Sequence, residues 1–175
     1  MSTVKKIVVI GPEGTGKSTV AQALAQHYNT VWCPEYARAY LTQHGMNYGY
    51  ADLLTIAQGQ LHQEDALLAK AQNGLYFVDT CMLVMKVWCE VVFEQCHSWI
   101  LKQIAERRYD LYLLCSTDLP WVADGLREYP DYEMRQRLFK MYFDLMVHGD
   151  TPWAVISGTH EERLQRAIAA VEDGE

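Results

Sequence analysis

The stretch Gly11-Pro12-Glu13-Gly14-Thr15-Gly16-Lys17-Ser18 decides the fold of this chain. It reads G-x-x-x-x-G-K-S, the P-loop pattern, in which glycines let successive backbone N–H groups surround phosphate oxygens at the start of a helix. A β-branched strand over residues 4–10 precedes it, and apolar residues at helical spacing follow it as far as Tyr28. The motif therefore has the strand, loop and helix order that phosphate binding requires.

The P-loop pattern assigns individual roles. Lys17 is expected to reach the β- and γ-phosphates of ATP, and the Ser18 hydroxyl to ligate Mg²⁺. Gly158, in the turn after the last expected strand, is assigned to the same nucleotide site. The full set of expected nucleotide-binding residues is Gly11, Glu13, Gly14, Thr15, Gly16, Lys17, Ser18, Thr19 and Gly158.

Composition limits the class of protein. The 175 residues fit one domain with a substantial core, and their net charge of −7 argues against a nucleic-acid or anionic lipid surface. Five scattered cysteines form no metal-binding spacing and indicate reduced thiols. Neither a signal segment nor a membrane-length apolar run is present. We therefore expect a cytoplasmic protein that binds small molecules.

The chain alternates short apolar runs with longer helical patterns. Strands are expected at 4–10, 30–33, 75–80, 111–115 and 153–157, and helices after the P-loop, over 50–73, 82–93 and 98–108, after Pro130, and from the capping box Thr159–Glu162. Asn73-Gly74 is expected to cap the long helix. This order predicts an α/β fold, one parallel sheet with helices on both faces, in a single domain over 1–175.

Two carboxylates follow strands at the sheet edge where ligands bind in such folds. Glu35 lies just after Pro34 and is a candidate to face the phosphoryl acceptor, or else a first-turn glutamate that suits the helix dipole. Asp79 ends a buried strand, where it would hold Mg²⁺, or else cap the next helix. Thr80, not the glutamate that activates water in many ATP-hydrolysing motors, follows Asp79. This favours transfer to an acceptor other than water.

A polar segment rich in proline and glycine follows the fourth strand, and we expect a lid over about 118–137. Arg127 would neutralise charge on the transferring phosphoryl group. The alternative, an ordinary surface arginine, applies to Arg127 and more strongly to Arg135 and Arg137. Trp88 and Trp99 could stack on a flat ligand, but core packing is the favoured reading of both tryptophans.

Four segments together resemble the ATP-binding kinase domain of NadR-type proteins, which also carry a nicotinamide-nucleotide adenylyltransferase domain. They are Gly11–Ser18, Pro34-Glu35-Tyr36-Ala37-Arg38, Asp79-Thr80, and Asp118-x-Pro120-Trp121-x-x-Asp124-x-Leu126-Arg127. The resemblance spans nearly the whole chain. It implies a P-loop NTPase fold like that of nucleoside and nucleotide kinases, with five parallel strands in the order 2-3-1-4-5.

The resemblance also implies an activity. The chain would be an ATP-dependent phosphotransferase that uses Mg²⁺ and converts a nucleoside such as nicotinamide riboside to its 5′-mononucleotide. Lys17, Glu35, Asp79 and Arg127 would be catalytic; Glu35, Tyr36, Arg38 and Asp79 would bind the acceptor; Ser18 and Asp79 would bind the metal. Trp32, Tyr36 and Tyr40 would stack on the pyridinium ring, or else pack under the second strand.

Two departures from the family keep alternatives open. Asp79-Thr80-Cys81 stands where the family has Asp-Thr-Asp, and the chain begins one strand before the P-loop, so no adenylyltransferase domain is expected ahead of it. Another nucleoside could be the acceptor, and either Glu35 or Asp79 could be the general base. A regulatory ATP-binding or ATPase switch is the alternative function, although no guanine-specific Asn-Lys-x-Asp motif is present.

Overall fold

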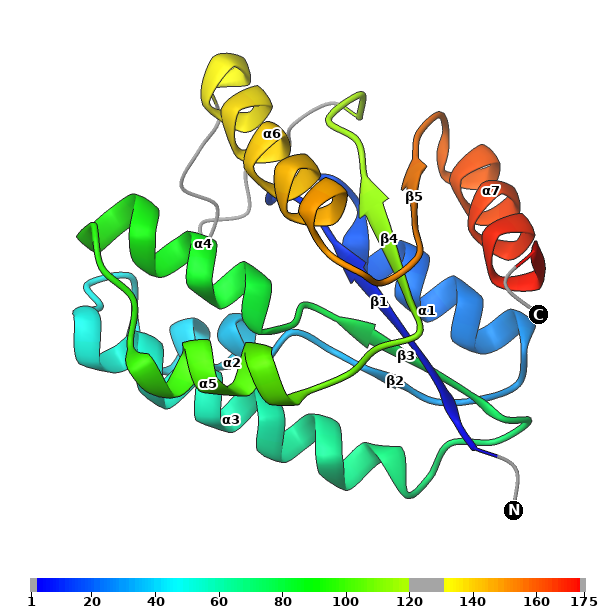
Figure 1. Cartoon of the computed structure of the whole chain (residues 1–175), viewed down its shortest axis with the longest axis horizontal. Helices are drawn as coiled ribbons and strands as arrows, with labels where there is room; N and C mark the ends of the chain where they lie inside the picture. The colour runs from blue at the N-terminus through cyan, green and yellow to red at the C-terminus, as the bar shows by residue number, and fades with distance from the viewer. Residues whose placement is uncertain (1–2, 120–130, 174–175) are drawn as a thin grey trace.

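A computed structural model describes residues 3–119 and 131–173 and contains a five-stranded parallel sheet in the order β2-β3-β1-β4-β5 (Figure 1). The fold class and the strand order expected from the sequence are confirmed. The elements are β1 (Lys5–Ile10), α1 (Lys17–His27), β2 (Trp32–Cys33), α2 (Tyr36–His44), α3 (Tyr50–Leu68), β3 (Leu75–Asp79), α4 (Met82–Phe93), α5 (Ser98–Glu106), β4 (Leu111–Cys115), α6 (Tyr132–His148), β5 (Trp153–Ile156) and α7 (His160–Asp173).

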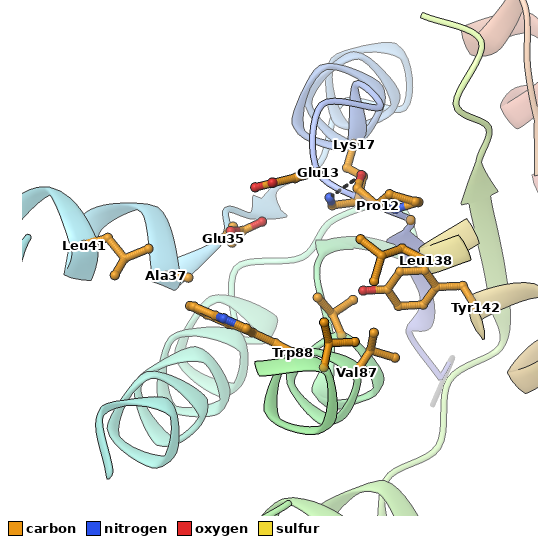
Figure 2. Close-up of a pocket in the computed structure, with 13 residues that line it drawn as sticks. Pro12, Glu13, Lys17, Glu35, Ala37, Leu41, Val87, Trp88, Leu138 and Tyr142 are labelled. Atoms are coloured by element: carbon orange, nitrogen blue, oxygen red, sulfur yellow. Dashed lines mark hydrogen bonds between the residues drawn. The ribbon is translucent and has the colours of Figure 1, made fainter. Parts of the chain in front are cut away.

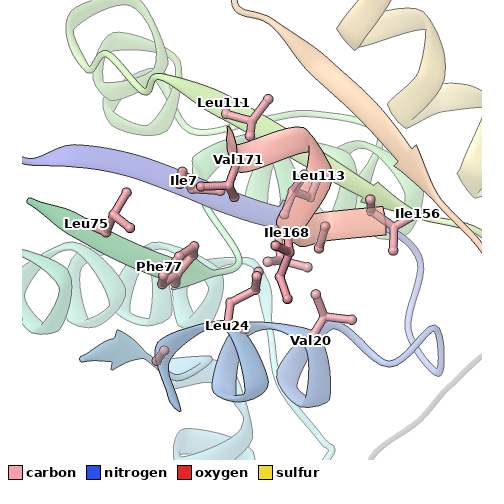
Figure 3. Close-up of a cluster of buried hydrophobic side chains, with 14 of the residues drawn as sticks. Ile7, Val20, Leu24, Leu75, Phe77, Leu111, Leu113, Ile156, Ile168 and Val171 are labelled. Atoms are coloured by element: carbon pink, nitrogen blue, oxygen red, sulfur yellow. The ribbon is translucent and has the colours of Figure 1, made fainter. Parts of the chain in front are cut away.

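The central strand β1 explains why both faces of the sheet are covered. Ile7 and Val9 point to one face, Val8 and Ile10 to the other, and none of the four side chains is exposed. The face of Ile7 packs against α1 and α7 (Figure 3), while the face of Val8 packs mainly against α4 and α6. A continuous β-branched run is therefore what this position requires.

A third apolar cluster joins helices α2, α3, α4 and α5 away from the sheet. Its buried members include Leu53, Ile56, Met85 and Ile100. Helix α4 contributes to this cluster with one side and to the sheet-facing cluster, through Val87, with another. This packing fixes α2 and α4 beside the carboxyl ends of β2 and β3.

The prediction that Asn73-Gly74 caps the long helix is wrong. Helix α3 ends at Leu68, and Asn73 and Gly74, with φ of 58° and 72°, form a tight turn closed by the antiparallel bridge between Gln72 and Leu75. Asn-Gly is the preferred pair where two successive residues must have positive φ. The pair therefore turns the chain into β3 instead of capping a helix.

The capping box at the start of α7 is confirmed. The Thr159 N–H donates to Glu162 Oε1 at 3.1 Å, and the Glu162 N–H donates to Thr159 Oγ1 at 3.2 Å.

Among the described helices, none is both long and apolar enough to cross a membrane.

Candidate functional site

The P-loop lies between β1 and α1 and approaches β4 closely. Gly11 has φ of 146°, and a Cβ atom there would lie 2.9 Å from the Cys115 carbonyl oxygen. Gly14 and Gly16 have φ of 74° and 78°. A side chain at Gly11 would both strain the backbone and collide with β4, so this glycine is required by packing as well as by conformation.

Three carbonyl groups of the loop accept hydrogen bonds from side chains. Thr15 Oγ1 donates to the Pro12 carbonyl at 2.6 Å, and Lys17 Nζ donates to the same oxygen at 3.2 Å. The Gly14 and Thr15 carbonyls accept from Arg135 and Arg163. In a planar trans peptide unit the carbonyl group and the N–H group of the next residue point in opposite directions. The three carbonyls point toward their side-chain donors, so the N–H groups of residues 13, 15 and 16 point away from those donors.

Asp79 lies beside the start of α1 and is completely buried. It ends β3 opposite Val9, and Ser18 Oγ donates to its Oδ2 at 2.5 Å. Burial and the charge of Glu35 raise the pKa of Asp79 to about 6, against the opposing effects of Lys17, Ser18 and Thr80. The N-cap of α4 is Cys81, so Asp79 does not cap that helix.

The donor chemistry at this point suits Mg²⁺. The Ser18 hydroxyl and the Asp79 carboxylate offer hard oxygen ligands next to the phosphate-binding loop, and Mg²⁺ in nucleotide sites is commonly held by one or two carboxylates plus phosphates. The residues present therefore fit the metal that the P-loop family uses.

Thr80 connects the two candidate carboxylates. Its Oγ1 lies 3.0 Å from Glu35 Oε2 and 3.2 Å from Asp79 Oδ1, and its side chain is buried. Its φ of 78° is unusual for a β-branched residue and indicates local backbone strain. Glu35 occupies the N-cap position of α2 without capping it by its side chain, so its carboxylate is available to the pocket.

Two glutamines of α3 hold the segment that carries Glu35. Gln60 accepts from the Tyr36 N–H at 2.8 Å and donates to the Thr80 carbonyl at 3.2 Å. Gln63 donates to the Pro34 carbonyl at 2.7 Å. The sequence analysis missed Gln60, although a glutamine on the apolar face of a helical pattern was a detectable signal.

Two pockets open beside the P-loop and share Glu13, Lys17, Glu35 and Leu41. The larger, of about 330 Å³, is also lined by Gly14, Gly16, Ser18, Thr19, Trp32, Pro34 and Arg38. The smaller, of about 120 Å³, extends between α2, α4 and α6, and its other lining residues are Gly11, Pro12, Ala37, Val84, Val87, Trp88, Val91, Leu138 and Tyr142.

The smaller pocket combines acidic and aromatic walls. Figure 2 shows the carboxylates of Glu13 and Glu35 on its P-loop side, with the rings of Trp88 and Tyr142 on the other sides. Trp88 Nε1 donates to the Tyr48 hydroxyl at 2.9 Å, which fixes the orientation of the indole. Trp88 thus packs against the third apolar cluster and also lines a pocket, whereas the sequence favours core packing alone.

The other residues expected at the acceptor side are distributed unevenly. Trp32 and Arg38 line the larger pocket. Tyr36 is not among the described lining residues of either pocket, because its ring packs on α3 at Gly59, where an added Cβ would come within 2.1 Å. Tyr40 donates its hydroxyl to Asp52 Oδ1 at 2.6 Å.

The placement of the arginines differs in part from what the sequence predicts. Arg127 and the rest of segment 120–130 lie outside the described residues, so the expected lid and the role of Arg127 stay predictions. Arg137 is exposed, but Arg135 is buried and is not a surface arginine. Arg163, which the sequence analysis missed, is completely buried beneath the P-loop.

Comparisons with known proteins agree with the fold. The family model described as "AAA domain" matches residues 6–163. The trifunctional NAD biosynthesis/regulator proteins NadR of Salmonella typhimurium (strain LT2) and Escherichia coli (strain K12) are 28% and 27% identical over 97% of this chain. The chain spans 42% of the length of each of these two relatives.

Solved structures extend the likeness. A NadR protein in complex with NR has a TM-score of 0.82 at 24% identity, covering 97% of this chain and 49% of the other. A deoxyadenosine kinase from M. mycoides with bound dATP has a TM-score of 0.64 at 16% identity, covering 96% and 99%. The resemblance to the NadR kinase region is confirmed, and the fold is that of a nucleoside or nucleotide kinase.

Proposed function

We propose that this chain, which belongs to the AAA domain family and has a kinase-like P-loop domain, transfers the γ-phosphoryl group of ATP to the 5′-hydroxyl of a nucleoside with a flat, cationic base. Nicotinamide riboside is the acceptor that we propose. The observation that carries this proposal is that the pocket lined by Trp88 and Tyr142 shares Lys17 and Glu35 with the phosphate-binding pocket.

The shared wall suits transfer between two bound substrates. ATP would lie on the P-loop with its phosphates near Lys17, and the acceptor would lie in the smaller pocket with its hydroxyl near Glu35. Phosphoryl transfer depends mainly on positioning and on charge stabilisation, and such a shared wall brings the reacting groups together. Mg²⁺ bound by Ser18 and Asp79 would supply positive charge to the phosphates.

Glu35 is the residue that we propose to orient or deprotonate the acceptor hydroxyl. It lines both pockets and is half-buried. Thr80 holds its carboxylate, and Gln60 holds the backbone of the next residue. Asp79 is completely buried and bonded to Ser18, so it suits the metal side. A positioned general base contributes roughly 10²–10⁴-fold to the rate.

The charge of the smaller pocket supports a cationic base. Its described lining residues include two carboxylates, Glu13 and Glu35, and one cation, Lys17, whose charge the phosphates of ATP would neutralise. Trp88 and Tyr142 also line this pocket, and a cation over the face of an aromatic ring gains roughly 0.5–2 kcal/mol. A pyridinium nucleoside matches all these features, while a neutral base uses only part of them.

The test measures acceptor-dependent ADP release with nicotinamide riboside and with its dihydro form, which has nearly the same shape but no positive charge. We expect kcat/KM to favour the cation by about 2- to 30-fold, the range that a cation–π contact supplies. Equal kcat/KM for the two would remove the argument from charge. ADP release that no nucleoside accelerates would favour the ATPase switch and contradict the proposed function.

A further inference from the structure

Arg163 is the largest completely buried side chain of the described residues, and it lies outside both pockets. It belongs to the first turn of α7, whose other charged residues at 161 and 162 are exposed. Taking a guanidinium group out of water costs several kcal/mol unless its charge is paired and its N–H groups are bonded. The position therefore calls for a physical explanation.

The contacts of Arg163 reach three separate loops at the carboxyl edge of the sheet. Nη1 donates to the Thr15 carbonyl of the P-loop at 2.6 Å, Nη2 donates to the Ser116 carbonyl after β4 at 3.0 Å, and Nε donates to the Gly158 carbonyl after β5 at 2.9 Å. Nη2 also forms an ion pair with Asp118. A single planar cation thus joins the loops after β1, β4 and β5.

Asp118 and Gly158 close the same network from the other side. Asp118 Oδ2 accepts from the Gly158 N–H at 2.7 Å. Although burial acts in the opposite direction, this bond and the charge of Arg163 keep the pKa of Asp118 below its usual value. Gly158 has φ of 100°, and a Cβ there would lie 2.9 Å from Glu162 Cβ. The turn that brings the Gly158 carbonyl to Arg163 therefore requires glycine at this position.

The contact with Thr15 controls the direction of one P-loop amide. Since the peptide is planar and trans, the Thr15 carbonyl and the Gly16 N–H point in opposite directions. Arg163 holds that carbonyl on the α7 side, which turns the Gly16 N–H away from α7. Gly16 lines the larger pocket, in which phosphate would bind, so the amide is oriented without any contact between Arg163 and ligand.

We propose that Arg163 is a positioning residue that holds the P-loop in its phosphate-binding conformation before nucleotide binds, and that couples this loop to those after β4 and β5. This inference rests on the proposed function only in that the P-loop binds a nucleotide. If the loop were preorganised by Arg163, its loss would lower the fraction of protein competent to bind and raise the apparent Kd accordingly.

The experiment measures binding of ADP and of inorganic tripolyphosphate, without any acceptor, to the parent protein and to Arg163→Lys. Lysine keeps the charge but lacks the planar guanidinium group that donates hydrogen bonds to all three loops. We expect both ligands to bind about 10- to 100-fold more weakly, the usual cost of losing a residue that orients ligating groups. If transfer can be measured, KM for ATP should rise by a similar factor, with kcat at saturating ATP changed much less.

Arg107→Lys is the matched control. Arg107 also pairs with a buried carboxylate, Glu64, at 2.9 Å, but it lines neither of the two pockets beside the P-loop. It should lose thermal stability while keeping the affinity of the parent for ADP. If Arg163→Lys is folded and binds tripolyphosphate as the parent does, the proposal is wrong.

A measurement on the unaltered protein covers the case in which Arg163→Lys does not fold. NMR order parameters of the P-loop amides in the ligand-free chain should already reach about 0.85, the value of rigid backbone. Order parameters below about 0.6 that rise only when ADP is added would contradict the proposal. Because neither experiment contains an acceptor, failure of the proposed acceptor chemistry leaves both results interpretable.

Discussion

Asp79→Asn is expected to make the ligand-free protein more stable at pH 8, although it removes a carboxylate proposed for the active site. The folded structure raises the pKa of Asp79 from its usual 3.8 to about 6, first by burial and then by the charge of Glu35. The ionised form is therefore less favourable in the folded protein than in the unfolded chain. Asparagine keeps nearly the same shape without this cost.

The magnitude follows from the two pKa values. Each pKa unit corresponds to about 1.4 kcal/mol, so ionised Asp79 costs about 3 kcal/mol of folding free energy above pH 6. Between about pH 4 and 6 the folded protein binds a proton that the unfolded chain does not. The cost is therefore lost as the pH falls through this range, and the advantage of Asp79→Asn should disappear near pH 4.

The assay is urea unfolding of both proteins at pH 8, 6 and 4.5, with no nucleotide or Mg²⁺ present. Asp52→Asn is a control of opposite sign, since the Gly49 N–H and the Tyr40 hydroxyl lower the pKa of Asp52. It should destabilise the protein at pH 8, and the loss should be nearly the same at pH 6 and 4.5, because Asp52 stays largely ionised in the folded and the unfolded chain above its usual pKa of 3.8. If Asp79→Asn is less stable than the parent at pH 8, or its difference is independent of pH, the electrostatic account of Asp79 is wrong.

The remaining predictions concern the acceptor side. Thr80→Val should lower acceptor-dependent kcat/KM by about 10-fold or more, because a hydrogen bond to a charged group such as Glu35 contributes roughly 1.5–3 kcal/mol. Thr80→Ser keeps the hydroxyl and should have a kcat/KM close to that of the parent. Equal kcat/KM for the two variants would contradict a role for the hydroxyl. Gly59→Ala should displace the Tyr36 ring and lower the melting temperature, since the new Cβ would lie 2.1 Å from that ring; an unchanged melting temperature would contradict this packing. Trp88→Leu should raise KM for nicotinamide riboside while leaving the KM for ATP unchanged, and a rise in the latter alone would move Trp88 to the nucleotide side.

The sequence predicted what depends on local pattern. The P-loop, the position of Glu35 after β2 and that of Asp79 at the end of β3 agree with the structure, and they follow from motifs or hydrophobic periodicity within a short window. The strand order also agrees, but only the family resemblance implied it. The turn at Asn73-Gly74 was missed because a glycine after a helical pattern also suits a helix cap.

The parts that escaped prediction depend on contacts between distant segments. Arg163 is 148 residues from Thr15 in the chain, and in sequence it is an ordinary charge in an amphipathic helix. Trp88 lines the pocket only because α4 is held between the sheet and α3. Arg135 is buried at the P-loop although its position on α6 lies off the stripe identified in the sequence. No local pattern separates these residues from surface or core ones.

The central claim is that phosphate leaves ATP for a nucleoside and not for water. The most direct measurement incubates the protein with ATP, Mg²⁺ and nicotinamide riboside and quantifies ADP and nucleoside monophosphate over the same time course. The account predicts equal amounts of the two products, and loss of both when Glu35→Gln replaces the parent. Release of ADP with inorganic phosphate, at the same rate with and without the nucleoside, would contradict it.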